Sequence, residues 1–212
     1  HTPSLDALGG LSRRMPITAA LFLVGVMAIS ALPALNGFVG EYLIYYGLFE
    51  TVAGAGGGII ASIFGIVVLS LIGGVVILAF TKLYGVTFLG SPRSHAVDHA
   101  AEVGSSRIVG CAIPVAGILL IGLAPMLFTG GIFSVAGEVV GVADVSGYYG
   151  RLDPQIWRVS SAALLLIAVV ALLLLYRRLK LRHRKVERSP VWGCGFGAAS
   201  HKMQYIGESY SE

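Results

Sequence analysis

One carboxylate stands alone in a long apolar stretch of the sequence. Glu41 is the only charged residue between Ile17 and Phe49. An ionised carboxylate in hydrocarbon costs about 2.5 to 3.5 kcal/mol on insertion scales, so a residue of this kind is expected to have a function. A desolvated carboxyl group that is balanced by water or a nearby cation can take up and release protons. The sequence leaves two interpretations open: a proton carrier, or one half of a static ion pair.

The residues around this carboxylate predict an interruption of the helix at membrane depth. Pro33 cannot donate a backbone hydrogen bond, and Asn36 and Gly37 tolerate unusual backbone angles. Irregular backbone within a membrane persists only where protein buries it or water reaches it, so we expect this segment to line a polar interior. Tyr42 and Tyr45 follow and supply hydroxyl groups for a hydrogen-bonded chain.

The composition is that of a membrane protein. Hydrophobic residues make up 56% of the chain, charged residues 12%, and the mean hydropathy is +0.82. An average soluble domain has about 25% charged residues. We therefore expect an all-α, polytopic helical membrane protein with about five transmembrane helices, one of them discontinuous near Pro33–Glu41. The expected helices cover Pro16–Pro33, Asn36–Val52, Ile59–Leu89, Ile108–Phe133 and Val159–Tyr176.

A basic cluster predicts the orientation of these helices. Seven Lys and Arg residues lie between positions 177 and 188, directly behind the last apolar segment, and such charge marks the cytoplasmic side. We expect an external loop at 136–158, an additional transmembrane helix at 159–180 and a cytoplasmic tail at 181–212.

Counting crossings backward from this tail exposes a conflict at the other end of the chain. Five crossings put the polar loop at 91–107 on the cytoplasmic side and the segment before Pro16 outside. Arg13 and Arg14 then lie on the side where the rule expects few positive charges.

Three other polar features each have a structural and a functional interpretation. Lys82 is either a relay or salt-bridge cation, or a helix-end lysine that extends to the headgroups. His95 and His99 are one helical turn apart, but no third ligand stands beside them, so a solvated surface is favoured over a metal site. Cys111 and Cys194 lack ligand spacing and are expected to be free thiols.

Motifs of several soluble enzyme classes are absent from the sequence. It contains no GxxxxGK[ST] phosphate loop, no GxSxG elbow and no CxxC pair. We therefore expect no cofactor, metal or redox centre of its own. A basic cluster directly behind a transmembrane segment indicates contact with the lipid bilayer and not with nucleic acid.

Three stretches resemble a known family. The order LGGLSRRMPITAALFLVGVMAISALPALNGFVGE, from Leu8 to Glu41, resembles the antiporter-like subunits of respiratory complex I, of Mrp sodium/proton antiporters and of group 4 hydrogenases. The segments FTKLYGVTFLGSPR at Phe80–Arg93 and VWGCGFGAASHKMQYIGESYS at Val191–Ser211 are similar to the large membrane subunit of hydrogenase-4 and formate hydrogenlyase type complexes.

This resemblance implies roles for several residues. Glu41 would be the terminal proton-transfer acid, and Lys82 and His1 would be further members of the proton path. Residues 1–135 would be the C-terminal half of a proton-conducting transporter domain, within a chain expected to be a piece of a longer protein. The tail at 191–211 would dock peripheral cytoplasmic redox subunits.

The resemblance also implies the setting. It predicts a multi-pass protein of a bacterial or archaeal inner membrane, assembled with other membrane subunits as part of a redox-driven oxidoreductase complex of the group 4 hydrogenase or NADH:quinone oxidoreductase kind. Two alternatives remain at this point: an Mrp-type sodium/proton antiporter subunit, and a purely structural membrane anchor.

Overall fold

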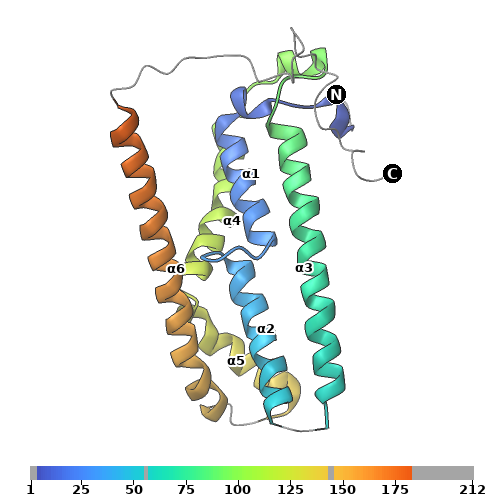
Figure 1. The fold of residues 1–212 in the computed structure, drawn as a ribbon, viewed down its shortest axis with the longest axis vertical. Helices are drawn as coiled ribbons and strands as arrows, with labels where there is room; N and C mark the ends of the chain where they lie inside the picture. The colour runs from blue at the N-terminus through green and yellow to red at the C-terminus, as the bar shows by residue number, and fades with distance from the viewer. Residues whose placement is uncertain (1–3, 55–56, 143–145, 183–212) are drawn as a thin grey trace.

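The computed structural model describes residues 4–54, 57–142 and 146–182, and these residues form helices joined by short connections (Figure 1). The predicted fold class, an all-α polytopic membrane protein, is confirmed. Three helices are long and apolar enough to cross a membrane, and two shorter ones are also apolar. The elements in chain order are η1 Leu5–Ala7, η2 Leu11–Arg13, α1 Pro16–Ile29, α2 Asn36–Ala53, α3 Ile59–Phe88, η3 His95–His99, α4 Ser105–Leu123, α5 Met126–Val140 and α6 Ser146–Leu181.

Helices α1 and α2 are two halves of one discontinuous pass. With 14 residues, α1 is about 21 Å long, which is shorter than the roughly 30 Å hydrocarbon core of a bilayer. Together with the 18 residues of α2 it matches the 30 residues of α3. The amide of Gly10, before α1, donates to Leu89 O after α3 at 2.8 Å, and Tyr45 of α2 meets Ser70 of α3 at 2.9 Å. The two halves therefore run antiparallel to α3 along its length (Figure 1).

Helices α4 and α5 repeat this arrangement. The carboxylate of Glu102, just before α4, accepts a hydrogen bond from the Ile17 amide at 2.8 Å, so α4 starts beside the start of α1. Gly122, near the end of α4, packs against the Ala34 carbonyl between α1 and α2. The span expected at 108–133 thus starts earlier, at Ser105. It is also interrupted, because Pro125 has no amide hydrogen to continue the hydrogen bonds of α4.

The stretch at 136–158, which we expected to be an external loop, differs from that expectation. Helix α5 continues to Val140, and α6 already begins at Ser146. The mixed polarity reflects a helix with one packed face, because Ile156 is only 2% exposed while Arg151 is exposed. The additional helix expected at 159–180 is therefore the second part of a 36-residue helix.

The pairing of the halves changes the number of passes between the two ends of the bundle. Within the described residues there are four passes: α1 with α2, α3, α4 with α5, and α6. The segment before α1, the connection at 90–104 and the end of α6 therefore lie at the same end (Figure 1). Arg13 and Arg14 join Arg177 and Arg178 there, which removes the conflict with the positive-inside rule.

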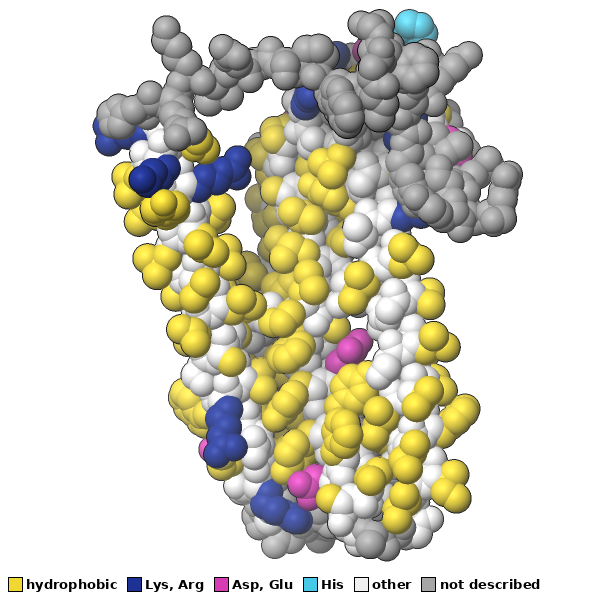
Figure 2. Space-filling view, viewed as in Figure 1, with side chains coloured by type: hydrophobic (Ala, Val, Ile, Leu, Met, Phe, Trp, Pro, Cys, Tyr) yellow, Lys and Arg dark blue, Asp and Glu magenta, His cyan; other side chains and the backbone are white. Residues whose placement is uncertain are grey.

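The surface has the polarity of a membrane protein. Lys and Arg side chains gather at the two ends of the bundle, and hydrophobic side chains cover the length between them (Figure 2). An acidic side chain is visible near mid-height on this face. Most of the large hydrophobic side chains of α3 and α6 are exposed, as expected where lipid is the solvent.

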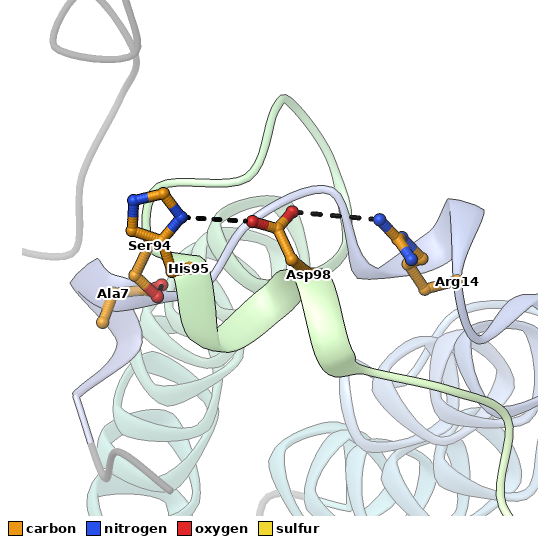
Figure 3. Close-up of polar contacts among 5 residues, drawn as sticks. All are labelled: Ala7, Arg14, Ser94, His95 and Asp98. Atoms are coloured by element: carbon orange, nitrogen blue, oxygen red, sulfur yellow. Dashed lines mark hydrogen bonds and ion pairs between the residues drawn. The ribbon is translucent and has the colours of Figure 1, made fainter.

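Polar contacts join the connection after α3 to the segment before α1 (Figure 3). Asp98 of η3 lies 3.8 Å from the Arg14 guanidinium and 3.4 Å from His95 Nδ1, and the Ser94 hydroxyl donates to Ala7 O at 2.7 Å. His95 thus pairs with an acid on an exposed surface. No group of three or more potential metal ligands occurs in the described part of the chain.

Candidate functional site

The break between α1 and α2 runs from Ser30 to Leu35. Ala31 and Ala34 have φ angles of 50° and 74°, in the left-handed region that residues with a Cβ rarely adopt. Pro33 lies between them and prevents a continuous helix. The buried Ser30 hydroxyl has no hydrogen-bond partner among the described residues. The site therefore contains both backbone strain and an unsatisfied polar group, a combination that is typical of functional positions.

The first turn of α2 packs closely on the last turn of α1. Asn36 and Gly37, which we expected in the break, are the first two residues of α2. A Cβ atom at Gly37 would overlap the Ala28 carbonyl oxygen, so only glycine allows this approach. Of the three residues expected to break the helix, Pro33 lies in the break, and the other two form the start of the next helix.

The second break, at Ala124–Pro125, lies directly against the first. A Cβ atom at Gly122 would overlap the Ala34 carbonyl oxygen and would lie 2.6 Å from Leu35 Cα. The backbone of α4 therefore touches the backbone of the first break with no side chain between them. Pro125 was visible as a signal in the sequence, but proline is tolerated inside transmembrane helices, so sequence reasoning treated the fourth span as continuous.

Glu41 lies one and a half turns into α2, is half-buried and borders a cavity of about 450 Å³ that opens on the side of the bundle. The other lining residues come from α1, the break, the start of α2 and α4: Gly25, Ala28, Ile29, Ala31, Asn36, Gly37 and Ile118. A volume of this size holds several water molecules where polar partners are present. Glu41 and the Asn36 amide provide such partners, so the carboxyl group sits where water can reach it within the bundle.

Tyrosines follow the carboxylate along α2. Tyr45 is one turn after Glu41, and its hydroxyl lies 2.9 Å from the Ser70 hydroxyl of α3. Tyr42 stacks with Phe38 at 6.3 Å between ring centroids and contacts Tyr46 at the same distance. Of the tyrosines near Glu41, Tyr45 is therefore the one whose hydroxyl group contacts another helix.

The structure separates Lys82 from Glu41. Because the Tyr45 side chain contacts Ser70 of the antiparallel helix α3, helical rise places Lys82 at least about 12 Å further along the bundle than Glu41. Lys82 lies in the last two turns of α3 and makes contacts there. A direct ion pair between the two groups is therefore not formed. His1 and the tail at 191–211 lie outside the described residues.

Sequence reasoning missed a carboxylate that holds α1 in place. Glu102 accepts hydrogen bonds from the Ile17 amide, from the Thr18 amide at 3.4 Å and from the Thr18 hydroxyl. The bond from the Thr18 side chain is the main cause that lowers the pKa of Glu102, and the backbone amides add to it. A cap supplied from 84 residues away has no local sequence signal, unlike the capping residues that directly precede a helix.

Comparison with known proteins identifies the first part of the chain. Residues 1–82, which include α1, the break, Glu41 and most of α3, match the family described as "NADH:quinone oxidoreductase/Mrp antiporter, TM". This range contains the whole broken helix and the residues that line the Glu41 cavity, apart from Ile118.

Three relatives extend the similarity. Hydrogenase-4 component B of Escherichia coli (strain K12) is 34% identical over 93% of this chain and 30% of its own length. Formate hydrogenlyase subunit 3 of the same strain is 37% identical over 58% of this chain and 21% of its own length. NADH-quinone oxidoreductase subunit M of Rickettsia conorii is 28% identical over 59% of this chain and 23% of its own length.

The chain spans about a third or less of the length of these relatives. The matches nevertheless agree with one another. Residues 1–82 belong to the NADH:quinone oxidoreductase/Mrp antiporter transmembrane family, and the relatives support an antiporter-like membrane subunit of the complex I type.

Proposed function

We propose that this chain conducts protons as part of a membrane subunit of a redox-driven complex, with Glu41 as the terminal proton-transfer acid. One observation carries the proposal: Glu41 borders an open cavity beside the break between α1 and α2, at mid-height of a bundle whose outer surface is otherwise apolar. A carboxyl group in this position exchanges protons with water in the cavity and changes its charge within the membrane.

The break supports this role in physical terms. The first amides of α2 have no partner within the helix and can bind water or a negative charge. Gly37 allows the start of α2 to approach the Ala28 carbonyl of α1 closely, and Gly122 allows α4 to touch the backbone of the first break, so no side chain separates the backbones at either contact. The strained alanines at 31 and 34 then fix the helix ends without filling the cavity.

The setting of the protein is part of the proposal. The relatives are named as components of hydrogenase-4, formate hydrogenlyase and NADH-quinone oxidoreductase. We infer that this chain also works with other membrane subunits and with peripheral redox subunits, the latter docked through residues 191–211. The basic end of the bundle would face the cytoplasm of a bacterial or archaeal cell, since Arg13, Arg14 and the basic end of α6 lie there together.

Lys82 and His1 have subordinate roles in this proposal. Because Lys82 lies about 12 Å further along the bundle than Glu41, it would pass protons through intervening water and not by direct contact. His1 would belong to the part of the path that precedes α1. Residues 1–135 would then form the C-terminal half of the conducting domain.

The test is proton pumping by the complex in inverted membrane vesicles, measured together with electron transfer in the same vesicles. We expect Glu41→Gln to lose pumping while the complex still assembles, and Glu41→Asp to retain part of it because an acid remains. Unchanged pumping in Glu41→Gln would leave the chain as a structural anchor. A requirement for sodium in the transport assay would favour the sodium/proton antiporter alternative.

A further inference from the structure

A pair of hydroxyl groups joins α2 to α3 one turn beyond Glu41. The Tyr45 hydroxyl lies 2.9 Å from Ser70 Oγ, and Ser70 Oγ lies 2.8 Å from the Ile66 carbonyl oxygen of its own helix. Ser70 is a polar residue within the long apolar helix α3. A hydroxyl group in such a helix must find partners inside the protein, because lipid offers none.

Either hydroxyl could donate in the Tyr45–Ser70 contact taken alone, but only one assignment makes both contacts hydrogen bonds at the same time. A serine hydroxyl has a single hydrogen, and a carbonyl oxygen can only accept, so Ser70 donates its hydrogen to Ile66 O. Ser70 Oγ must then act as the acceptor of its second bond, and Tyr45 must be the donor. The Tyr45 hydrogen is therefore directed toward α3, and the lone pairs of its oxygen remain available.

The direction of the tyrosine side chain connects this pair to the carboxyl group. Long side chains on a helix lean toward the N-terminus and lie over the turn that contains residue i−4, which for Tyr45 is Glu41. The Cβ atoms of residues four apart are about 5 to 6 Å from each other. Helix geometry therefore directs the free lone pairs of Tyr45 toward the turn that carries Glu41, where a protonated carboxyl group could donate to them directly or through one water.

We propose that Ser70 is a positioning residue for proton transfer at Glu41: it holds the Tyr45 hydroxyl as a hydrogen-bond acceptor toward Glu41. This inference rests on the proposed function. Ser70 itself does not relay the proton, because its hydrogen is bound to a carbonyl oxygen that cannot accept a proton in exchange. Without Ser70, the Tyr45 hydroxyl would rotate freely and compete as a donor for the ionised form of Glu41.

The experiment uses the full complex in inverted vesicles, with pumping normalised to electron transfer and to the amount of assembled complex. The variants are Ser70→Ala, Tyr45→Phe, the double variant and Ser70→Thr. We expect Ser70→Ala to lower pumping by about 2- to 12-fold, the range that corresponds to one neutral hydrogen bond. Ser70→Thr should restore pumping because threonine keeps the hydroxyl group. Ser62→Ala serves as the control serine in the same helix and should pump normally.

Two readouts separate positioning from helix packing. In the double variant, Ser70→Ala should add nothing to Tyr45→Phe, whereas a packing role of Ser70 would persist without the tyrosine hydroxyl. The infrared C–O stretching band of labelled tyrosine should shift in Ser70→Ala and return in Ser70→Thr, since this band depends on whether the hydroxyl donates or accepts.

The outcomes distinguish this inference from the proposed function. If Glu41→Gln abolishes pumping while Ser70→Ala pumps normally, Ser70 has no positioning role and the function of Glu41 stands. Additive losses in the double variant would also overturn the positioning role. If Glu41→Gln pumps normally, the proposed function fails, and with it the inference.

Discussion

The two helix breaks lie against each other, yet they are built differently. The break between α1 and α2 takes six residues, Ser30 to Leu35, and contains two alanines in the left-handed region. The break between α4 and α5 takes two residues and contains only negative φ angles, −129° at Ala124 and −59° at Pro125. One break is strained and the other relaxed.

The helices that follow the breaks also differ. Glu41 comes in the second turn of α2 and borders the cavity at the break. The acidic residue of α5, Glu138, comes in its last turn and is exposed. Under the proposed function, the proton site is the break that combines backbone strain with a half-buried carboxylate, and the second break supplies the backbone surface against which the first one packs.

Removing the close contact between the breaks should have the largest effect on stability. Gly122→Ala would push a methyl group into the Ala34 carbonyl, and overpacking of this kind costs about 1 to 3 kcal/mol. Thermal unfolding in detergent should reveal a lower midpoint. Gly117→Ala in the same helix meets nothing within 4 Å and is the matched control, expected to unfold at or above the wild-type midpoint. Equal midpoints for the two variants would refute the contact.

The cap on α1 should make stability depend on pH. Hydrogen bonds from Thr18 and the Ile17 amide lower the pKa of Glu102 below its usual value of 4.5. The stabilisation is thus complete above that value and is lost as the pH falls through the lowered pKa. The difference in unfolding midpoint between wild type and Glu102→Gln should be largest near neutral pH and shrink in acid. A difference that stays constant with pH would contradict the cap.

Relieving strain in the first break should have the smallest effect on the free energy of unfolding. Ala31→Gly removes the cost of a left-handed alanine, about 1 to 2 kcal/mol, and adds the entropic cost of glycine, about 0.5 to 1 kcal/mol. The net change should be a stabilisation of up to about 1.5 kcal/mol, measured by denaturant unfolding. Ala124→Gly is the control in the relaxed break and should destabilise, because there is no strain to relieve.

Much of the first break could be predicted from the sequence. Proline at position 33 indicates an interruption wherever it lies in a helix, and a lone carboxylate in an apolar stretch points to function. The discontinuity near Pro33–Glu41 was predicted, but its two halves were counted as two spans, because Pro16–Pro33 and Asn36–Val52 are each nearly as long as a span. Whether the two segments make one pass or two depends on where α1 ends. It ends at Ile29 because of the local backbone angles that follow, and composition does not determine these angles.

The contacts that hold the site were harder to predict. Glu102 and Ile17 are 85 residues apart, as are Arg93 and Leu8, whose carbonyl accepts a hydrogen bond from the guanidinium at 3.1 Å. Such pairs are set by how the helices pack and leave no periodic pattern. Gly122 is one of 29 glycines, and only the packed structure distinguishes it from those with open space around them.

The most direct test of the account compares the two acids that follow the two breaks. Protons pumped per electron should be measured in vesicles that contain the full complex with Glu41→Gln or Glu138→Gln. Loss of a proton-transfer group costs about 100-fold or more, so Glu41→Gln should pump almost nothing while electron transfer and assembly persist. Glu138→Gln should pump like the wild type. Equal pumping by both variants would contradict the claim that the strained break with its half-buried carboxylate is the proton site.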